Sequence, residues 1–142
     1  MENILISACL LGLPCRYDGR SVEYTEIEKL KKKYNLIPIC PEIYGGLPTP
    51  RVPAERVGQR VINKNGGDVT ESYDRGAACA LKLARDCGCR IAILKERSPS
   101  CGSHEIYDGS FGGKLLHGMG VTAELLKRHG IRVLSEEEIS EL

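Results

Sequence analysis

Aromatic residues and long apolar runs are scarce in this chain. Tryptophan is absent and Phe111 is the single phenylalanine, so a stacking platform for single-stranded nucleic acid is not expected. No window is long and apolar enough to span a bilayer. The start, Met1-Glu2-Asn3, has neither the basic nor the apolar region of an export signal. We therefore expect a cytoplasmic protein without a membrane partner.

An excess of charge of either sign is missing as well. The 20 basic and 19 acidic side chains leave a formal net charge of +1. That balance argues against broad electrostatic binding to nucleic acid or to anionic lipid. A length of 142 residues suits one compact domain with a real core. We expect a single domain over residues 1–142.

Strand-like and helix-like segments alternate along the chain. The strand-like segments are residues 3–8, 35–39, 90–95 and 131–134. One helix is expected to begin at Thr25, and a second is expected to have Thr70 as its N-terminal cap. A third is expected over residues 121–129 and a last one after Ser135, where Glu138 completes a capping box. This alternation predicts an α/β fold of Rossmann-like type, with a mostly parallel sheet flanked by helices.

Two long segments look irregular. Residues 40–55, "CPEIYGGLPTPRVPAE", contain four prolines and two glycines, a composition that disfavours helix and central strand. Their length makes them a candidate binding loop. A small hairpin is expected around residues 60–67, with its turn at Asn65-Gly66-Gly67. Residues 97–120 form a second glycine-rich loop.

What the chain has in quantity is cysteine, with seven residues. An odd count in a cytosolic chain makes a disulfide scaffold the weaker explanation. Reduced cysteines then indicate metal binding, catalysis or packing. Cys79 lies beside the apolar stripe of a helix, and Cys87 and Cys89 are spaced more closely than zinc ligands usually are. We expect these three to pack.

Cys9, Cys40 and Cys101 form a different group, because each follows a strand-like run and lies in a loop rich in glycine or proline. Parallel strands bring their carboxyl ends to one edge of a sheet, where ligands of such folds bind. A shared site at that edge is therefore predicted. Cys15 lies near Cys9 in sequence and is a further ligand, a neighbouring thiol or a catalytic one.

Three kinds of site would use these thiols. A structural zinc ion would need a fourth ligand, for which His104, His117 and His129 are available, although we expect His104 to be an exposed loop residue. An iron–sulfur cluster also suits soft thiolates. A cysteine nucleophile would need a nearby base. The residues alone leave open a zinc-stabilised binding module, a cluster enzyme and a cysteine-based sulfur-transfer enzyme.

Longer motifs carry a resemblance. They are "SACLLGLPCRYDG", "CPEIYGGLPTPRVPAE", "DVT…GA", "LKERSPSCG", "IYDGSF" and "GMGVTAELL…GI". Together, over essentially the whole chain, they resemble the thiouracil desulfidase family. The resemblance implies a 4Fe–4S cluster on Cys9, Cys40 and Cys101, with one iron open to the substrate sulfur. It also implies non-redox conversion of 2- or 4-thiouracil to uracil and sulfide.

The same resemblance assigns roles near the cluster. Glu42 is expected to carry the proton, and Ser98 to orient the substrate or to act as a transient nucleophile. A small thiolated pyrimidine is the expected partner, and thiolated tRNA the less favoured one because basic excess is missing. Gly45 and Gly46 would allow close backbone approach. The remaining candidates are expected mainly to tie loops or to form a solvated rim: Arg16, Asp18, Arg51, Asp108 and Lys95-Glu96-Arg97.

Overall fold

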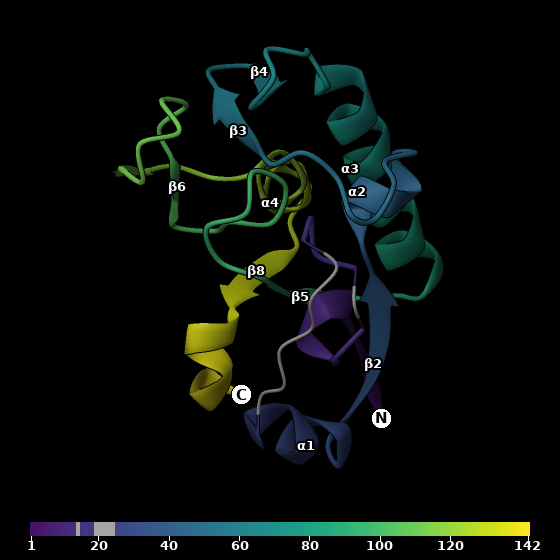
Figure 1. Ribbon diagram of the computed structural model, residues 1–142. Coiled ribbons are helices and arrows are strands. Elements are labelled where there is room, and N and C mark those ends of the chain that lie inside the picture. Colours follow the sequence, from purple (N-terminus) through teal and green to yellow (C-terminus); the bar gives the residue numbers. More distant parts are fainter. Residues whose placement is uncertain (14, 19–24) are drawn as a thin grey trace.

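A parallel sheet forms the centre of the molecule (Figure 1). The computed structural model describes residues 1–13, 15–18 and 25–142. Four strands lie in the order β2-β1-β5-β8, and each pairs in parallel with its neighbour. Their bounds are Glu2–Ser7 (β1), Tyr34–Ile39 (β2), Ile91–Leu94 (β5) and Arg132–Ser135 (β8). The predicted α/β fold with a parallel sheet is confirmed.

Helices cover both faces of this sheet. Helices α3 (Thr70–Asp86) and α4 (Val121–Arg128) pack on one face, and α1 (Thr25–Lys31) packs on the other with the terminal 3-10 helix η2 (Glu136–Glu141). Figure 1 shows the two pairs on opposite sides of β5 and β8. Within the described residues, no helix has the length and apolarity needed to cross a membrane.

The apolar run of β1 supplies both halves of the core. Leu5 faces α3 and α4, whereas Ile4 and Ile6 face α1 and η2. All three are fully buried. Successive side chains of a strand point to opposite faces, so a strand covered on both sides needs the continuous apolar run seen in the sequence.

Some local predictions are wrong for identifiable reasons. Residues 40–55 do contain a helix, the single turn α2 (Pro41–Tyr44), because Pro41 occupies the first helical position, where a missing N–H costs nothing. Thr70 starts α3 and does not cap it, and its hydroxyl instead accepts a hydrogen bond from the Val61 N–H. The box of Ser135 and Glu138 is confirmed.

Two hairpins lie outside the main sheet. Strands β3 (Ala54–Val57) and β4 (Arg60–Asn63) pair with each other. The expected turn at residues 65–67 also folds β4 back, with a bridge from Ile62 to Asp68 and hydrogen bonds from the Asn63 N–H to the Gly67 carbonyl oxygen and from the Val69 N–H to that of Val61. Strands β6 (Glu105–Tyr107) and β7 (Leu115–His117) pair inside the segment that was expected to be a loop. Such three-residue strands are too short to leave a period in the sequence.

Helix α2 rests on α3 through a glycine contact. A Cβ placed on Gly76 would lie 1.9 Å from the Pro41 carbonyl oxygen, so only glycine permits this approach. We predict that Gly76→Ala lowers the free energy of unfolding by about 1–3 kcal/mol, because α2 must shift. Thermal unfolding of the metal-free protein measures this. Gly112→Ala, where the nearest atom is a side-chain oxygen at 3.2 Å, is the control, and equal melting temperatures for the two variants would refute the prediction.

Candidate functional site

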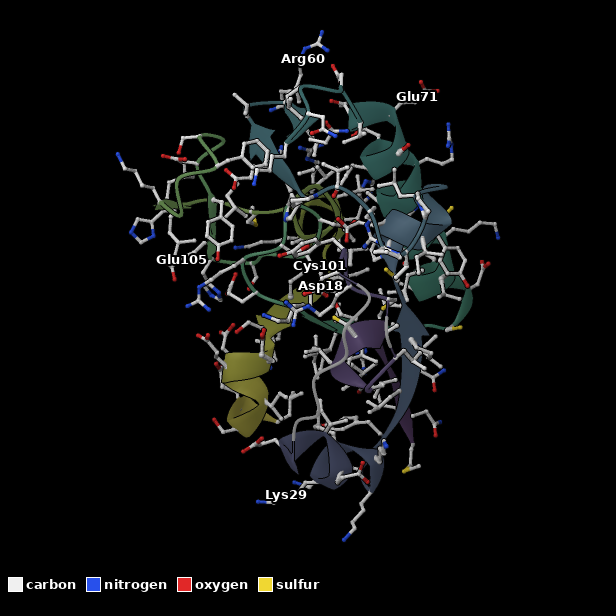
Figure 2. All side chains as sticks on the ribbon, viewed as in Figure 1. Asp18, Lys29, Arg60, Glu71, Cys101 and Glu105 are labelled. Atoms are coloured by element: carbon white, nitrogen blue, oxygen red, sulfur yellow. The ribbon has the colours of Figure 1, made fainter. Side chains whose placement is uncertain are left out.

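Three predicted cysteines follow three strands of the sheet. Cys9 lies in the 3-10 turn η1 (Ala8–Leu10) directly after β1, and Cys40 caps α2 directly after β2. Cys101 lies in the loop after β5. Strand order reverses between β1 and β5, which is where ligands of such sheets bind. In Figure 2, Cys101 lies near the middle of the molecule, whereas Lys29, Arg60 and Glu71 lie at its periphery.

Cys15 lies between two of these thiols. Its side chain hydrogen-bonds with those of Cys40 and Cys9, and the Cys40 thiol also donates to the Cys15 carbonyl oxygen at 3.7 Å. The bond with Cys40 lowers the pKa of Cys15, but the bond with Cys9 and burial outweigh it and raise that pKa to about 11. The pKa of Cys40 is also raised, by its bond with Cys15 and by burial.

Cys101 completes the group from the other side of β1. It is 5% exposed, and its thiol hydrogen-bonds with the side chains of Ser7 and Ser100. Burial raises the pKa of Cys101 to about 12, and the nearby charges of Glu42 and Cys40 add to the effect. Cys15 thus contacts Cys9 and Cys40, and Cys101 lies within electrostatic range of Cys40. The shared site on Cys9, Cys40 and Cys101 stays a prediction.

Glu42 faces this group and is held by two donors. Arg51 Nη2 lies 2.6 Å from Glu42 Oε2, and the Tyr73 hydroxyl donates to Glu42 Oε1. The Glu42 side chain is 15% exposed. Burial and the charge of Glu42 raise the pKa of Tyr73, so its hydroxyl stays a donor. Both contacts suit a carboxylate that acts as an acceptor.

Arg51 ties loops together, as expected, and it does so inside the site. The same Nη2 that binds Glu42 also donates to the Cys15 carbonyl oxygen at 3.1 Å. Tyr73 lies on the buried face of α3. The contact of its hydroxyl with Glu42 was not predicted. Helical spacing indicates which face of the helix a tyrosine occupies, but it does not indicate which group its hydroxyl contacts.

Ser98 shapes the turn that carries Cys101. Its hydroxyl oxygen accepts hydrogen bonds from the N–H groups of Ser100 and Cys101, at 3.1 and 3.0 Å. This is the turn role expected of serine before proline. Both contacts use the hydroxyl oxygen as acceptor, so neither involves the hydroxyl proton.

Glu96 is not part of a solvated rim, contrary to expectation. Its side chain is 3% exposed and accepts hydrogen bonds from the N–H groups of Arg97, Ser103, His104 and Glu105. Burial alone would raise the pKa of Glu96, but the backbone and side-chain bonds from His104 and its neighbours lower it to about 2. A charged run at a strand end is usually solvated, and nothing in its spacing reveals a ring of backbone donors.

The histidines stay outside the thiol group. His104 is 56% exposed, as expected, and its Nδ1 lies 3.0 Å from Glu96 Oε2. His117 belongs to the exposed strand β7, and His129 contacts Arg85. None of the three has a contact with a cysteine of the site among the described residues.

Glu96 predicts a pH dependence of stability. Its folded-state pKa of about 2 lies below the ordinary 4.5, so its contribution is complete above about pH 5 and is lost as the pH falls toward 2. We expect Glu96→Gln to lower the free energy of unfolding at pH 6 and to differ little from the parent near pH 2. Urea unfolding at several pH values measures the difference, and a gap that stays constant down to pH 2 would contradict it.

The donor set has the chemistry that an iron–sulfur cluster needs. Thiolates are soft ligands that suit iron–sulfur clusters and zinc alike. Among the residues the structure describes, no three His, Cys, Asp or Glu side chains converge as one metal ion requires. Thiolates around a larger cluster need not meet at a point.

Comparisons with known proteins assign the chain to a family. A family model described as 2-thiouracil desulfurase matches residues 4–138. The chain belongs to the 2-thiouracil desulfurase family. It is 44% identical to the uncharacterized protein YbbK of Bacillus subtilis (strain 168), over 98% of this chain and 99% of that protein. The family membership expected from the motifs is thereby confirmed.

A solved structure is similar over the same length. It is the [4Fe-4S]-dependent thiouracil desulfidase TudS, which is 51% identical and superposes with a TM-score of 0.95 over 100% of this chain and 95% of that one. At this similarity the α/β fold of the desulfurase family applies to the chain as a whole. The resemblance extends through every loop that carries a cysteine of the site.

Proposed function

We propose that this chain is a desulfidase of thiouracil, acting through a 4Fe–4S cluster on Cys9, Cys40 and Cys101, with one desulfidase domain over residues 1–142. The thiouracil desulfidase activity and [4Fe-4S] dependence of TudS, at 51% identity, and the family model support the reaction and the cluster. The observation that carries the proposal for this chain is the gathering of these thiols with Glu42 at the carboxyl edge of one sheet.

The cluster, when bound, supplies a Lewis-acidic iron for the thiocarbonyl sulfur. The protein's own part begins with its thiols. Cys9 and Cys40 enter from neighbouring strands and Cys101 from the far side of β1, so three separate loops would hold the cluster. Ser7, at the end of β1, donates toward Cys101 and would steady that ligand.

Glu42 would move the proton of the reaction. Thiouracil and water give uracil and hydrogen sulfide, so one C–O bond forms, one C–S bond breaks and no electron is transferred. The Glu42 carboxylate would accept a proton from the attacking water and return it to the departing sulfur. Arg51 and Tyr73 fix both of its oxygens, which orients the carboxylate and limits its rotation.

Ser98 would orient the substrate. Its oxygen is occupied by the N–H groups of Ser100 and Cys101, which directs the hydroxyl proton away from the turn. A donor in that position would bind a polar edge of the pyrimidine ring beside Cys101. This arrangement supports the orienting role more than the role of transient nucleophile, because no base among the contacts of Ser98 accepts its proton.

A thiol nucleophile is the rival mechanism. Reactive cysteines have a lowered pKa, whereas burial and neighbouring groups raise the pKa values of Cys15 and Cys101. The direction of these shifts does not match that of a reactive cysteine, and the support for the cluster comes from the family and from TudS. No observation favours a zinc-stabilised binding module.

Anaerobic turnover tests the proposal. Protein reconstituted with iron and sulfide is expected to hold about four irons per chain and to convert 2- or 4-thiouracil to uracil and sulfide in equal amounts. Protein loaded with zinc serves as the control and is expected to be inactive. Turnover by the zinc-loaded or metal-free protein would rule out the cluster mechanism.

A further inference from the structure

The loop that carries Ser98 and Cys101 is closed by one buried carboxylate. Glu96 Oε1 accepts the N–H groups of Ser103, His104 and Glu105 at 2.8, 3.1 and 3.3 Å. It also accepts the Arg97 N–H at 3.3 Å. The donors lie on both sides of the segment 98–101, so the carboxylate fastens the start of the loop to its end.

The anchor itself is fixed to the sheet. Glu96 follows β5 closely, and its own N–H donates to Glu136 Oε1 at 2.7 Å. Lys95 donates its N–H to the Ser7 hydroxyl and pairs with Glu136 at 2.9 Å. The base of the loop is therefore held by β1 and by η2.

The loop also bends sharply beside this anchor. Arg97 has a φ of +67°, a left-handed conformation that is costly for a residue with a side chain. Such conformations persist where surrounding contacts fix them and are common at functional sites. Here the bond from the Arg97 N–H to Glu96 fixes it, and the next residue is Ser98.

The opposite side of the same turn is held by α4. Val121 and Thr122 donate their N–H groups to the carbonyl oxygens of Pro99 and Ser100 at 2.9 and 2.8 Å, and the buried hydroxyls of Ser100 and Thr122 are 2.9 Å apart. The side toward residues 102–105 is held in part by backbone bonds, from the Gly120 N–H to the Gly102 carbonyl oxygen at 2.8 Å and from the Gly118 N–H to that of His104 at 3.0 Å. Glu96 adds the bonds that join this side to Arg97, so loss of its charge would weaken the hold on the turn there.

We propose that Glu96 is a positioning residue for the desulfidase site, whose ionised carboxylate holds the turn of Ser98 and Cys101 in place for substrate and cluster. The proposal rests on the proposed function. Charge is essential to it, because hydrogen bonds to an ionised acceptor are about twice as strong as neutral ones and several donors share one oxygen. The low pKa of Glu96 agrees with this.

The test compares Glu96→Gln with Glu55→Gln. Glu55 is a matched control, since its Oε1 also accepts two loop N–H groups, those of Gly109 and Phe111, at 2.9 and 3.1 Å. In metal-free protein, alkylation of Cys101 followed by mass spectrometry reports opening of the turn. We expect at least about a 10-fold faster reaction at Cys101 in Glu96→Gln, with an unchanged rate at Cys79, and no change at either thiol in Glu55→Gln.

Reconstituted enzyme gives the second measurement. At equal iron content, Glu96→Gln is expected to lower kcat by about 10- to 100-fold with KM changed less than about threefold, because small displacements of reacting groups cost that much. Should Glu96→Gln fail to fold, Glu96→Asp replaces it, because aspartate keeps the charge on a shorter side chain. Its alkylation rate at Cys101 and its kcat are expected to lie between the parental values and those predicted for Glu96→Gln. If the Glu96 variants had the same alkylation rate at Cys101 and the same kcat as the parent, the proposal would be overturned. An inactive parent would instead contradict the proposed function, while the alkylation result would still decide whether Glu96 holds the turn.

Discussion

Replacing Cys9, Cys40 or Cys101 singly with serine is expected to remove the iron–sulfur absorbance and to reduce turnover to background. A serine hydroxyl is a hard and weakly acidic ligand, so it does not replace a thiolate on iron. Each of the three loops leaves a different strand end, so each thiol reaches the site from its own direction. Iron analysis after anaerobic reconstitution measures the effect, with bound iron falling from about four to less than about one per chain.

Cys79→Ser provides the control for this series. Cys79 is a half-buried cysteine of α3, and it has no contact with the thiol group in the described structure. The variant is expected to keep the iron content and turnover of the parent. A cluster that survives loss of Cys9, Cys40 or Cys101, or that is lost with Cys79, would show that the ligands are assigned wrongly.

Glu42→Gln is expected to keep the cluster and to lose turnover by about 10²- to 10⁴-fold, the usual contribution of a proton-transferring group. The amide has the shape of the carboxylate but cannot accept and return a proton. It also keeps an oxygen for Arg51 or for Tyr73, so the loop should stay folded. Absorbance reports the cluster, and uracil formation under anaerobic conditions reports the rate.

A second buried pair supplies the matched control for Glu42. Glu124, in α4, pairs with Arg56, whose side chain is also largely buried. Among the described residues, neither side chain has a hydrogen bond or ion pair with a cysteine. Glu124→Gln removes the same charge from the same kind of pair, so it controls for loss of stability. Should Glu42→Gln turn over thiouracil at the parental rate, or should Glu124→Gln be equally inactive, Glu42 does not carry the proton.

The main sheet was predictable because its signals are strong and local. The run of Ile4, Leu5 and Ile6 is continuous, as a strand buried on both faces requires, and parallel pairing then places every strand end at one edge. That geometry predicts the meeting of Cys9, Cys40 and Cys101 without knowledge of any contact. Cys87 and Cys89 pack against the core as expected.

Details that depend on tertiary contacts could not be predicted in the same way. The hydroxyl of Tyr73 reaches Glu42 only because α2 packs closely on α3 at Gly76. The Glu96 carboxylate meets backbone donors from residues 97 and 103–105, which no side-chain pattern encodes. Short elements such as β6 and α2 depend on tertiary contacts with neighbouring segments, so the periodicity of apolar residues in the sequence did not predict them.

The absorbance spectrum of the cluster during a titration with thiouracil tests the account most directly. The Glu42→Gln variant is the protein to use, without oxygen, because bound substrate then accumulates. The account predicts that the iron–sulfur bands change and saturate with thiouracil but stay constant with uracil, which lacks the sulfur. An unchanged spectrum at concentrations of thiouracil that equilibrium dialysis shows to be bound would contradict binding of the substrate sulfur to the cluster.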